Sequence, residues 1–190
     1  QVSLARTITL RYDFDAALPA VEVDPTQIRQ VVMNLVMNAA EAIGERPGRI
    51  TVSTAVVMAE RATLHAYIQG DRLAEGRYVR LEVEDTGTGI APEMLDRIFD
   101  PFFTTKFAGR GLGLAAVLGI VHGHHGALQV VSTPGAGATF RMLLPAQAGP
   151  AAAAPGAPQG PAWRGTGTAL IVDDEVNVRS VLTRMLASLG

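Results

Sequence analysis

The sequence predicts an α+β fold in two layers, with a mostly antiparallel sheet that carries its helices on one face. Short segments that alternate apolar and polar residues, typical of half-buried strands, are separated by segments with helical periodicity. Runs of strands with helices gathered between them are typical of this fold class. The expected strands are residues 7–14, 49–57, 78–84, 128–132 and 139–144.

The longest expected helix runs from Pro25 to Ile43. Asp24 is a favourable N-cap, Pro25 stands at the first helical position, and Gln27 is placed to close a capping box. Gly44 follows the last periodic residue and is expected to end the helix. Two shorter helices are expected at residues 92–98 and 112–121.

Composition excludes several classes of protein. The chain has 190 residues, of which 48% are hydrophobic, enough for one domain with a core plus a remnant. A net charge of −2 without a basic face argues against nucleic acid as the main partner. The absence of cysteine excludes disulfides, thiolate metal sites and thiol nucleophiles. The sequence has no membrane-length apolar run, and with neither a signal-peptide pattern nor an initiator Met we expect a piece of a longer protein. The absence of cysteine fits a cytoplasmic environment.

The chain is expected to divide into three parts. Residues 1–145 hold all the strands and helices described above. Residues 146–165 consist largely of Ala, Pro and Gly without periodicity, which is typical of a linker. Residues 166–190 contain one strand and one helix, too few to support a core, and are expected to begin a second domain.

One face of the long expected helix carries amides and carboxylates. Gln30, Asn34, Asn38, Glu41 and Glu45 follow one another at spacings of three or four residues. A solvated face would explain the charged residues, but asparagine is a poor helix former and an unusual surface residue in a helix interior. Amide and carboxylate oxygens could instead hold a hard cation such as Mg²⁺.

A second motif, "EDTGTGI", directly follows the clearest expected strand. It has the composition of a tight turn. Alternatively, Asp85 at the end of the strand accepts a hydrogen bond from the amino group of an adenine. Gly87 and Gly89 would then let a flat ligand approach the backbone.

Glycines at alternate positions, Gly109, Gly111 and Gly113, stand in front of an expected helix. Each glycine destabilises the folded state by about 0.5–1 kcal/mol relative to alanine, so we expect a role there that requires a backbone without side chains. The free amides at the start of a helix suit a phosphate, and Lys106 and Arg110 would add charge-assisted contacts. The preceding "FDPFF" is interpreted as an apolar knot that serves packing.

The histidines are not expected to form a metal site. His122, His124 and His125 in "HGHHG" suit the end of a helix, where imidazoles lie beside free carbonyls and Gly123 and Gly126 suit the exit turn. His65 lies in a poorly patterned connection.

Taken together, "QVVMNLVMNAAEAI", "DTGTGI", "FDPFF" and "GRGLGLA" resemble the N, G1, F and G2 boxes of the ATP-binding domain of bacterial sensor histidine kinases. The resemblance implies the Bergerat fold, a two-layer α/β sandwich that holds ATP and Mg²⁺. It implies that Asn38 coordinates Mg²⁺, that Asn34 supports the metal and phosphates, and that Asp85 receives the adenine amino group. Asn34, Asn38 and Lys106 are the expected catalytic residues. The residues expected at the nucleotide are Asn34, Asn38, Glu41, Asp85, Gly87, Gly89, Ile90, Lys106, Gly109, Arg110, Gly111, Leu112, Gly113 and Leu114.

The segment "ALIVDDE" after the linker resembles the start of a response-regulator receiver domain. Asp173 and Asp174 would be its acidic Mg²⁺-binding pair, and two adjacent carboxylates do call for a cation or a proton between them. The combination is similar to a hybrid histidine kinase of two-component phosphorelay signalling.

The residue one helical turn before Asn38 separates two activities of this fold. ATP hydrolases of similar fold have a Glu there that activates water, whereas this chain has Asn34, which cannot take a proton. This favours a kinase whose partners are an upstream His-containing dimerisation domain, a receiver domain or response regulator, and a second copy in a homodimer. The chain alone is expected to bind Mg–ATP without autophosphorylation. A hydrolase and a degenerate nucleotide-binding module remain the alternatives.

Overall fold

The computed structural model describes residues 8–104 and 111–147. Several expectations therefore lie outside the described residues: the strand position at residue 7, the site residues Lys106, Gly109 and Arg110, most of the linker, and the receiver-like segment with Asp173 and Asp174. The expected domain boundaries stay predictions.

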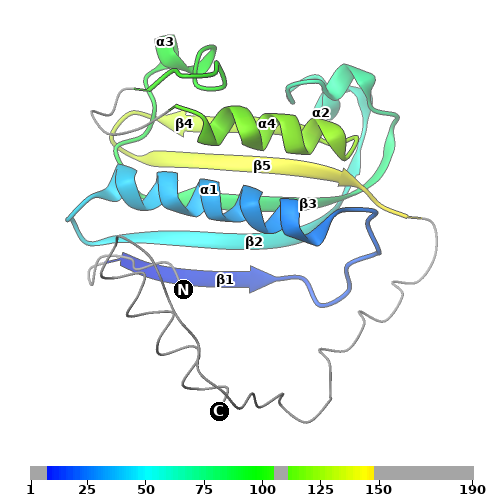
Figure 1. Ribbon diagram of the computed structural model, residues 1–190. Helices are drawn as coiled ribbons and strands as arrows, with labels where there is room; N and C mark the ends of the chain where they lie inside the picture. The colour runs from blue at the N-terminus through cyan, green and yellow to red at the C-terminus, as the bar shows by residue number, and fades with distance from the viewer. Residues whose placement is uncertain (1–7, 105–110, 148–190) are drawn as a thin grey trace, which may run out of the picture. The chain divides into compact units, whose positions relative to one another are not determined.

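The described residues form one five-stranded mixed sheet with the order β1-β2-β3-β5-β4 (Figure 1). β1 pairs in parallel with β2, and the other three pairs are antiparallel, so the expected mostly antiparallel sheet is confirmed. The strands are β1 (Ile8–Phe14), β2 (Gly48–Ala59), β3 (Gly76–Asp85), β4 (Ala127–Thr133) and β5 (Gly137–Pro145).

Helix α1 (Pro25–Ile43) has the expected bounds. The Asp24 carboxylate accepts hydrogen bonds from the N–H groups of Thr26 and Gln27, at 2.7 and 3.4 Å. Gly44, at φ +68°, ends the helix. The expected capping box is wrong, because the N–H of Asp24 donates to the Nε2 of His124 at 3.0 Å instead of to Gln27.

Helix α4 (Gly113–Gly123) lies beside α1 on the same face of the sheet (Figure 1). Its exit turn differs from expectation: the left-handed residue is His125, at φ +53°, and Gly123 is helical. Gly126 is required for a different reason, since a Cβ there would lie 2.5 Å from the carbonyl oxygen of Leu143. None of the described helices is long and apolar enough to cross a membrane.

Helix α3 (Pro92–Leu95) is shorter than expected. The chain continues beyond it in turns, with Ile98 N–H donating to the Met94 carbonyl at 3.0 Å. Tighter bonds replace the α-helical pattern there, with Arg97 N–H on the Met94 carbonyl and Asp100 N–H on the Arg97 carbonyl, both at 2.9 Å.

The main core lies between the sheet and the two long helices. Its residues with at most 1% exposure are Val31, Leu35, Ile50, Val83, Val117, Val121, Leu128 and Met142. The buried residues of α1 lie on its side facing this core and are Val31, Leu35, Val36, Ala39 and Ile43.

A second, smaller cluster lies on the opposite face of the sheet, as the alternation of Tyr78 with Val79 along β3 requires. The connection of residues 60–75 covers it with α2 (Arg61–Leu64) and a 3₁₀ helix (Gly70–Arg72). The sequence did not predict these elements. Leu64, Tyr67 and Leu73 anchor them by packing against residues of strands, some of which are distant in sequence.

Candidate functional site

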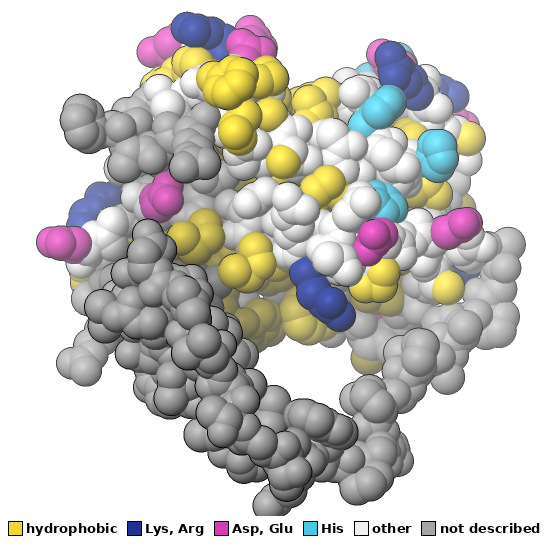
Figure 2. Space-filling model, viewed as in Figure 1, with side chains coloured by type: hydrophobic (Ala, Val, Ile, Leu, Met, Phe, Trp, Pro, Cys, Tyr) yellow, Lys and Arg dark blue, Asp and Glu magenta, His cyan; other side chains and the backbone are white. Residues whose placement is uncertain are grey.

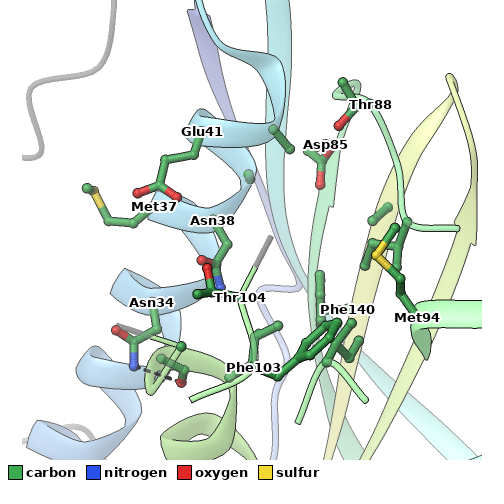
Figure 3. A pocket seen from close by; sticks show the side chains of 18 of the residues that line it. Asn34, Met37, Asn38, Glu41, Asp85, Thr88, Met94, Phe103, Thr104 and Phe140 are labelled. Carbon is green, nitrogen blue, oxygen red and sulfur yellow. Dashed lines mark hydrogen bonds between the residues drawn. The ribbon is translucent and has the colours of Figure 1, made fainter. Parts of the chain in front are cut away.

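A cavity of about 610 Å³ opens between α1, the end of β3, α3 and the start of α4 (Figure 3). Residues from four of the predicted motifs line it. The predicted members are Asn34, Asn38, Glu41, Asp85, Gly89, Ile90, Gly111, Leu112, Gly113 and Leu114.

Asp85 is the last residue of β3 and is 5% exposed. Its Oδ1 accepts a hydrogen bond from the Gly87 N–H at 2.7 Å, and the Ala138 N–H also donates to the carboxylate. Burial raises the pKa of Asp85 above its ordinary value, although these two N–H groups partly offset that effect. Asp85 therefore offers a fixed, water-poor acceptor to a ligand in the cavity.

The two glycines after Asp85 have different roles. Gly89 lines the cavity at φ +67°, and a Cβ there would lie 2.3 Å from the Thr133 carbonyl oxygen. Gly87 does not line the cavity. Its missing side chain allows packing against Ala42, because a Cβ would lie 2.7 Å from the Ala42 Cβ.

On the wall opposite Asp85, α1 presents Asn34, Asn38 and Glu41 (Figure 3). Asn34 Nδ2 donates to the carbonyl oxygen of Gly113 at 3.3 Å, which joins α1 to the start of α4. Because this bond uses the amide nitrogen, the oxygen is the atom that Asn34 can offer to a ligand. Gln30 and Glu45, expected on the same face, do not line the cavity.

The start of α4 forms the end of the cavity next to Asn34. Leu112, the N-cap residue, has an apolar side chain and does not cap the first N–H groups of α4. Gly111 is at φ +64°, and a Cβ there would lie 2.5 Å from the carbonyl carbon of Phe102. This end has the electrostatic character that suits an anion.

The apolar knot is only partly as expected. Phe99 and Phe103 pack against the main core, and Phe103 also lines the cavity. Phe102 instead is 75% exposed with a left-handed φ of +67°.

Sequence reasoning missed the apolar wall of the cavity. This wall is formed by Met94, Ile98, Phe103, Ala138 and Phe140. Figure 3 labels Met94, Phe103 and Phe140 among them. Apolar residues on helices and strands indicate a core in any sequence, so no local signal distinguishes those that face a ligand. A slot between apolar side chains with a carboxylate at one end suits a flat aromatic ring that carries a donor.

The described residues contain no cluster of three or more His, Asp or Glu side chains that could hold a metal by itself. The oxygens of Asn34, Asn38 and Glu41 at the cavity fit a hard cation that takes its remaining ligands from water and from phosphate oxygens.

His122, His124 and His125 lie at the end of α4 and do not line this cavity. Figure 2 shows cyan histidine side chains on the surface in this part of the molecule. The Nδ1 of His124 lies 2.8 Å from the Ile120 carbonyl oxygen, as expected of an imidazole at a helix end. His122 contacts Gln69 through its ring nitrogen. His65 pairs with Asp71 at 2.5 Å.

Residues 23–148 match the family model described as histidine kinase-, DNA gyrase B- and HSP90-like ATPase. The chain belongs to this family. The match includes α1, the Asp85 loop, the start of α4 and the last two strands, and thus every wall of the cavity.

The chain is also similar to several sensor kinases. The chain is 40% identical to sensor histidine kinase ZraS of Escherichia coli (strain K12), over 74% of this chain and 26% of the relative. It is 40% identical to sensory histidine kinase/phosphatase NtrB of Rhizobium leguminosarum bv. phaseoli, over 77% and 37%. It is 39% identical to sensor kinase CckA of Brucella abortus (strain 2308), over 98% and 20%. The chain thus spans between 20% and 37% of the length of these relatives.

Solved structures of histidine kinases have the same fold. The catalytic domain of ThkA, in a nucleotide-free form, matches with a TM-score of 0.57 and 33% identity, over 74% of this chain and 80% of that chain. Full-length ShkA in complex with AMPPNP matches with a TM-score of 0.58 and 29% identity, over 76% and 27%.

Proposed function

We propose that residues 1–145 are the ATP-binding catalytic domain of a bacterial hybrid sensor histidine kinase. The observation that carries the proposal is the arrangement of one cavity: a buried carboxylate at one end, an apolar slot beside it, and amide oxygens and a helix start at the other end. ShkA, a structural relative, was solved with AMPPNP.

The nucleotide is proposed to lie along this arrangement. Its adenine packs between Ile90, Met94 and Phe140, and its amino group donates to Asp85. Asn38 coordinates Mg²⁺, and the first N–H groups of α4 bind phosphate oxygens. Lys106, Gly109 and Arg110 are proposed to add phosphate contacts.

Asn34 supports phosphoryl transfer over hydrolysis. Its amide nitrogen already donates to Gly113, and an amide cannot remove a proton from water. In the proposed reaction a ring nitrogen of a histidine on an upstream dimerisation domain attacks the γ-phosphorus. A new P–N bond then forms while the bond to the β-phosphate oxygen breaks, which releases ADP.

The hybrid part of the proposal concerns the segment after the linker. The similarity to sensor kinase CckA extends over 98% of this chain and thus into residues 166–190, which supports a common arrangement. Asp173 and Asp174 are proposed as the Mg²⁺-binding pair of a receiver domain. A cytoplasmic location, a homodimeric whole protein and a receiver or response-regulator partner belong to the same proposal.

The test compares Asn38→Ala with Gln30→Ala, a change on the same helix outside the cavity. We expect wild-type protein to bind Mg–ATP with essentially no phosphate release. Asn38→Ala should weaken Mg²⁺-dependent ATP binding about tenfold or more, whereas Gln30→Ala should leave that affinity unchanged. Sustained phosphate release that Asn38→Ala abolishes would establish a hydrolase. Unchanged affinity in Asn38→Ala would indicate a degenerate binding module.

A further inference from the structure

The turn between β4 and β5 lies directly against the cavity loop of residues 86–90. The Gly135 N–H donates to the Thr88 carbonyl at 2.7 Å, and the Ile90 N–H donates to the Ser132 hydroxyl oxygen at 2.8 Å. The Thr88 N–H in turn donates to the Ala42 carbonyl of α1 at 3.0 Å. The loop is therefore fixed from both sides by groups far from it in sequence.

Ser132 stands at the centre of these contacts. Its hydroxyl accepts from Ile90 and at the same time donates to the carbonyl oxygen of Gly137 at 2.9 Å. The hydroxyl must act as acceptor toward Ile90, which presents its N–H, and as donor toward Gly137, which presents its carbonyl oxygen. One half-buried hydroxyl thus connects the cavity loop to both strands of the hairpin.

The segments that Ser132 connects are those beside Asp85. Ile90 lines the cavity, and Gly137 packs on the Asp85 backbone so closely that a Cβ there would lie 1.9 Å from the Asp85 carbonyl oxygen. Ala138, next to Gly137, donates its N–H to the Asp85 carboxylate. Ser132 itself does not line the cavity, so any effect on a ligand must pass through these neighbours.

From these contacts we propose that Ser132 is a positioning residue that sets the base specificity of the nucleotide site. It holds the loop at a fixed distance from the Asp85 carboxylate, so that the carboxylate meets a donor such as an adenine amino group and rejects an acceptor such as the guanine oxygen. The proposal rests on the proposed function, in which the base lies against Asp85.

Loss of the hydroxyl is expected to change selectivity more than overall binding. Without it, Ile90 N–H and Gly137 C=O each lose this hydrogen bond, and the loop gains freedom to move relative to Asp85. ATP then loses a well-aligned hydrogen bond from its adenine, whereas GTP, held mainly through its phosphates, loses little. We expect the ratio of GTP to ATP dissociation constants to fall about fivefold in Ser132→Ala, the effect of about one hydrogen bond.

The experiment measures ATP and GTP dissociation constants and thermal unfolding for wild type, Ser132→Ala, Ser132→Thr and Ser53→Ala. Ser132→Thr retains the hydroxyl and is expected to restore the wild-type ratio. Ser53→Ala, a half-buried serine of β2 outside the cavity, is the control and is expected to leave it unchanged. Ser132→Cys, a weaker hydrogen-bonding group, serves if Ser132→Ala does not fold, and should shift the ratio in the same direction.

Equal weakening of ATP and GTP in Ser132→Ala, or a lower unfolding temperature with an unchanged ratio, would overturn the proposal and leave Ser132 a purely structural residue. A selectivity loss in Ser132→Thr would overturn it as well. Failure of the proposed function is recognised separately, because wild-type protein would then bind neither nucleotide.

Discussion

The two long walls of the cavity are built differently. The loop wall, Asp85 with residues 86–90, carries a buried carboxylate, and its backbone is hydrogen-bonded to α1 on one side and to the β4–β5 hairpin on the other. The helix wall presents Asn34 and Asn38 from a helix that is capped at both ends by its own residues. A change in the loop wall therefore disturbs the fold, whereas removal of the Asn38 side chain alters the chemistry on an intact backbone.

The largest expected effect concerns how closely the loop wall is packed. Gly137 and Gly135 both have left-handed φ, +103° and +81°, but only Gly137 would bring a Cβ into contact, at 1.9 Å from the Asp85 carbonyl oxygen. We expect Gly135→Ala to cost about 1 kcal/mol of unfolding free energy and Gly137→Ala about 3 kcal/mol or more, measured by urea denaturation. Equal losses of unfolding free energy in the two variants would mean that the loop wall can adjust to an added Cβ, and would contradict the close packing inferred for it.

The second prediction uses the raised pKa of Asp85. Because burial raises its folded-state pKa above the unfolded value, its contribution to the stability of the nucleotide-free domain is fully present below the unfolded pKa and lost as pH rises through the folded pKa. ATP binding has the opposite dependence if the ionised carboxylate accepts the adenine amino group. Affinity should then fall as pH decreases through the raised pKa, by at most about tenfold per pH unit.

Asp85→Asn is the control, because it removes this titration. The stability of wild type relative to the variant should rise on acidification while the ATP affinity of wild type falls, measured by thermal unfolding and calorimetric titration over one pH series. The pH dependence of wild-type stability alone does not suffice, because other groups contribute to it. The N–H groups of Thr26 and Gln27 hold the pKa of Asp24 below its ordinary value, so Asp24 changes stability with pH in the opposite direction to Asp85. Parallel profiles for wild type and Asp85→Asn would refute the assigned role.

The smallest expected effect concerns how the helix wall is held. His124 joins the ends of α1 and α4 that lie away from the cavity: its Nε2 accepts from Asp24 N–H, and its Nδ1 lies against the Ile120 carbonyl. A glutamine can replace the Nε2 contact and an asparagine the Nδ1 contact. We expect His124→Gln to keep near wild-type stability and His124→Asn to lose about 1 kcal/mol, measured by urea denaturation.

The reverse order of the two His124 variants would show that His124 mainly caps α4 and that its bond to α1 contributes little. Either order leaves the loop wall untouched, so the affinity ratio of ATP to GTP should stay at its wild-type value in both. A changed ratio would mean that the two walls are coupled through α4.

The sequence by itself determined the elements whose causes are local. α1 has its predicted bounds because Asp24, Pro25 and Gly44 act within a few residues of the ends of the helix. Alternation along each strand likewise depends only on neighbouring residues, and the five strands were predicted to within a few residues. Asn38 was singled out because asparagine is unusual in a helix interior, and Asp85 because its motif resembles the G1 box of sensor histidine kinases; both residues line the cavity.

Tertiary structure decided what depends on contacts between distant residues. No local pattern shows that Asp24 N–H is bonded to His124, one hundred residues away, or that Phe102 is exposed while Phe103 lines the cavity. The same holds for Ser132, an ordinary strand serine until the fold places Ile90 and Gly137 on its hydroxyl. A hydrogen bond or a close approach across the fold depends on where two segments meet, and that is fixed only when the whole core packs.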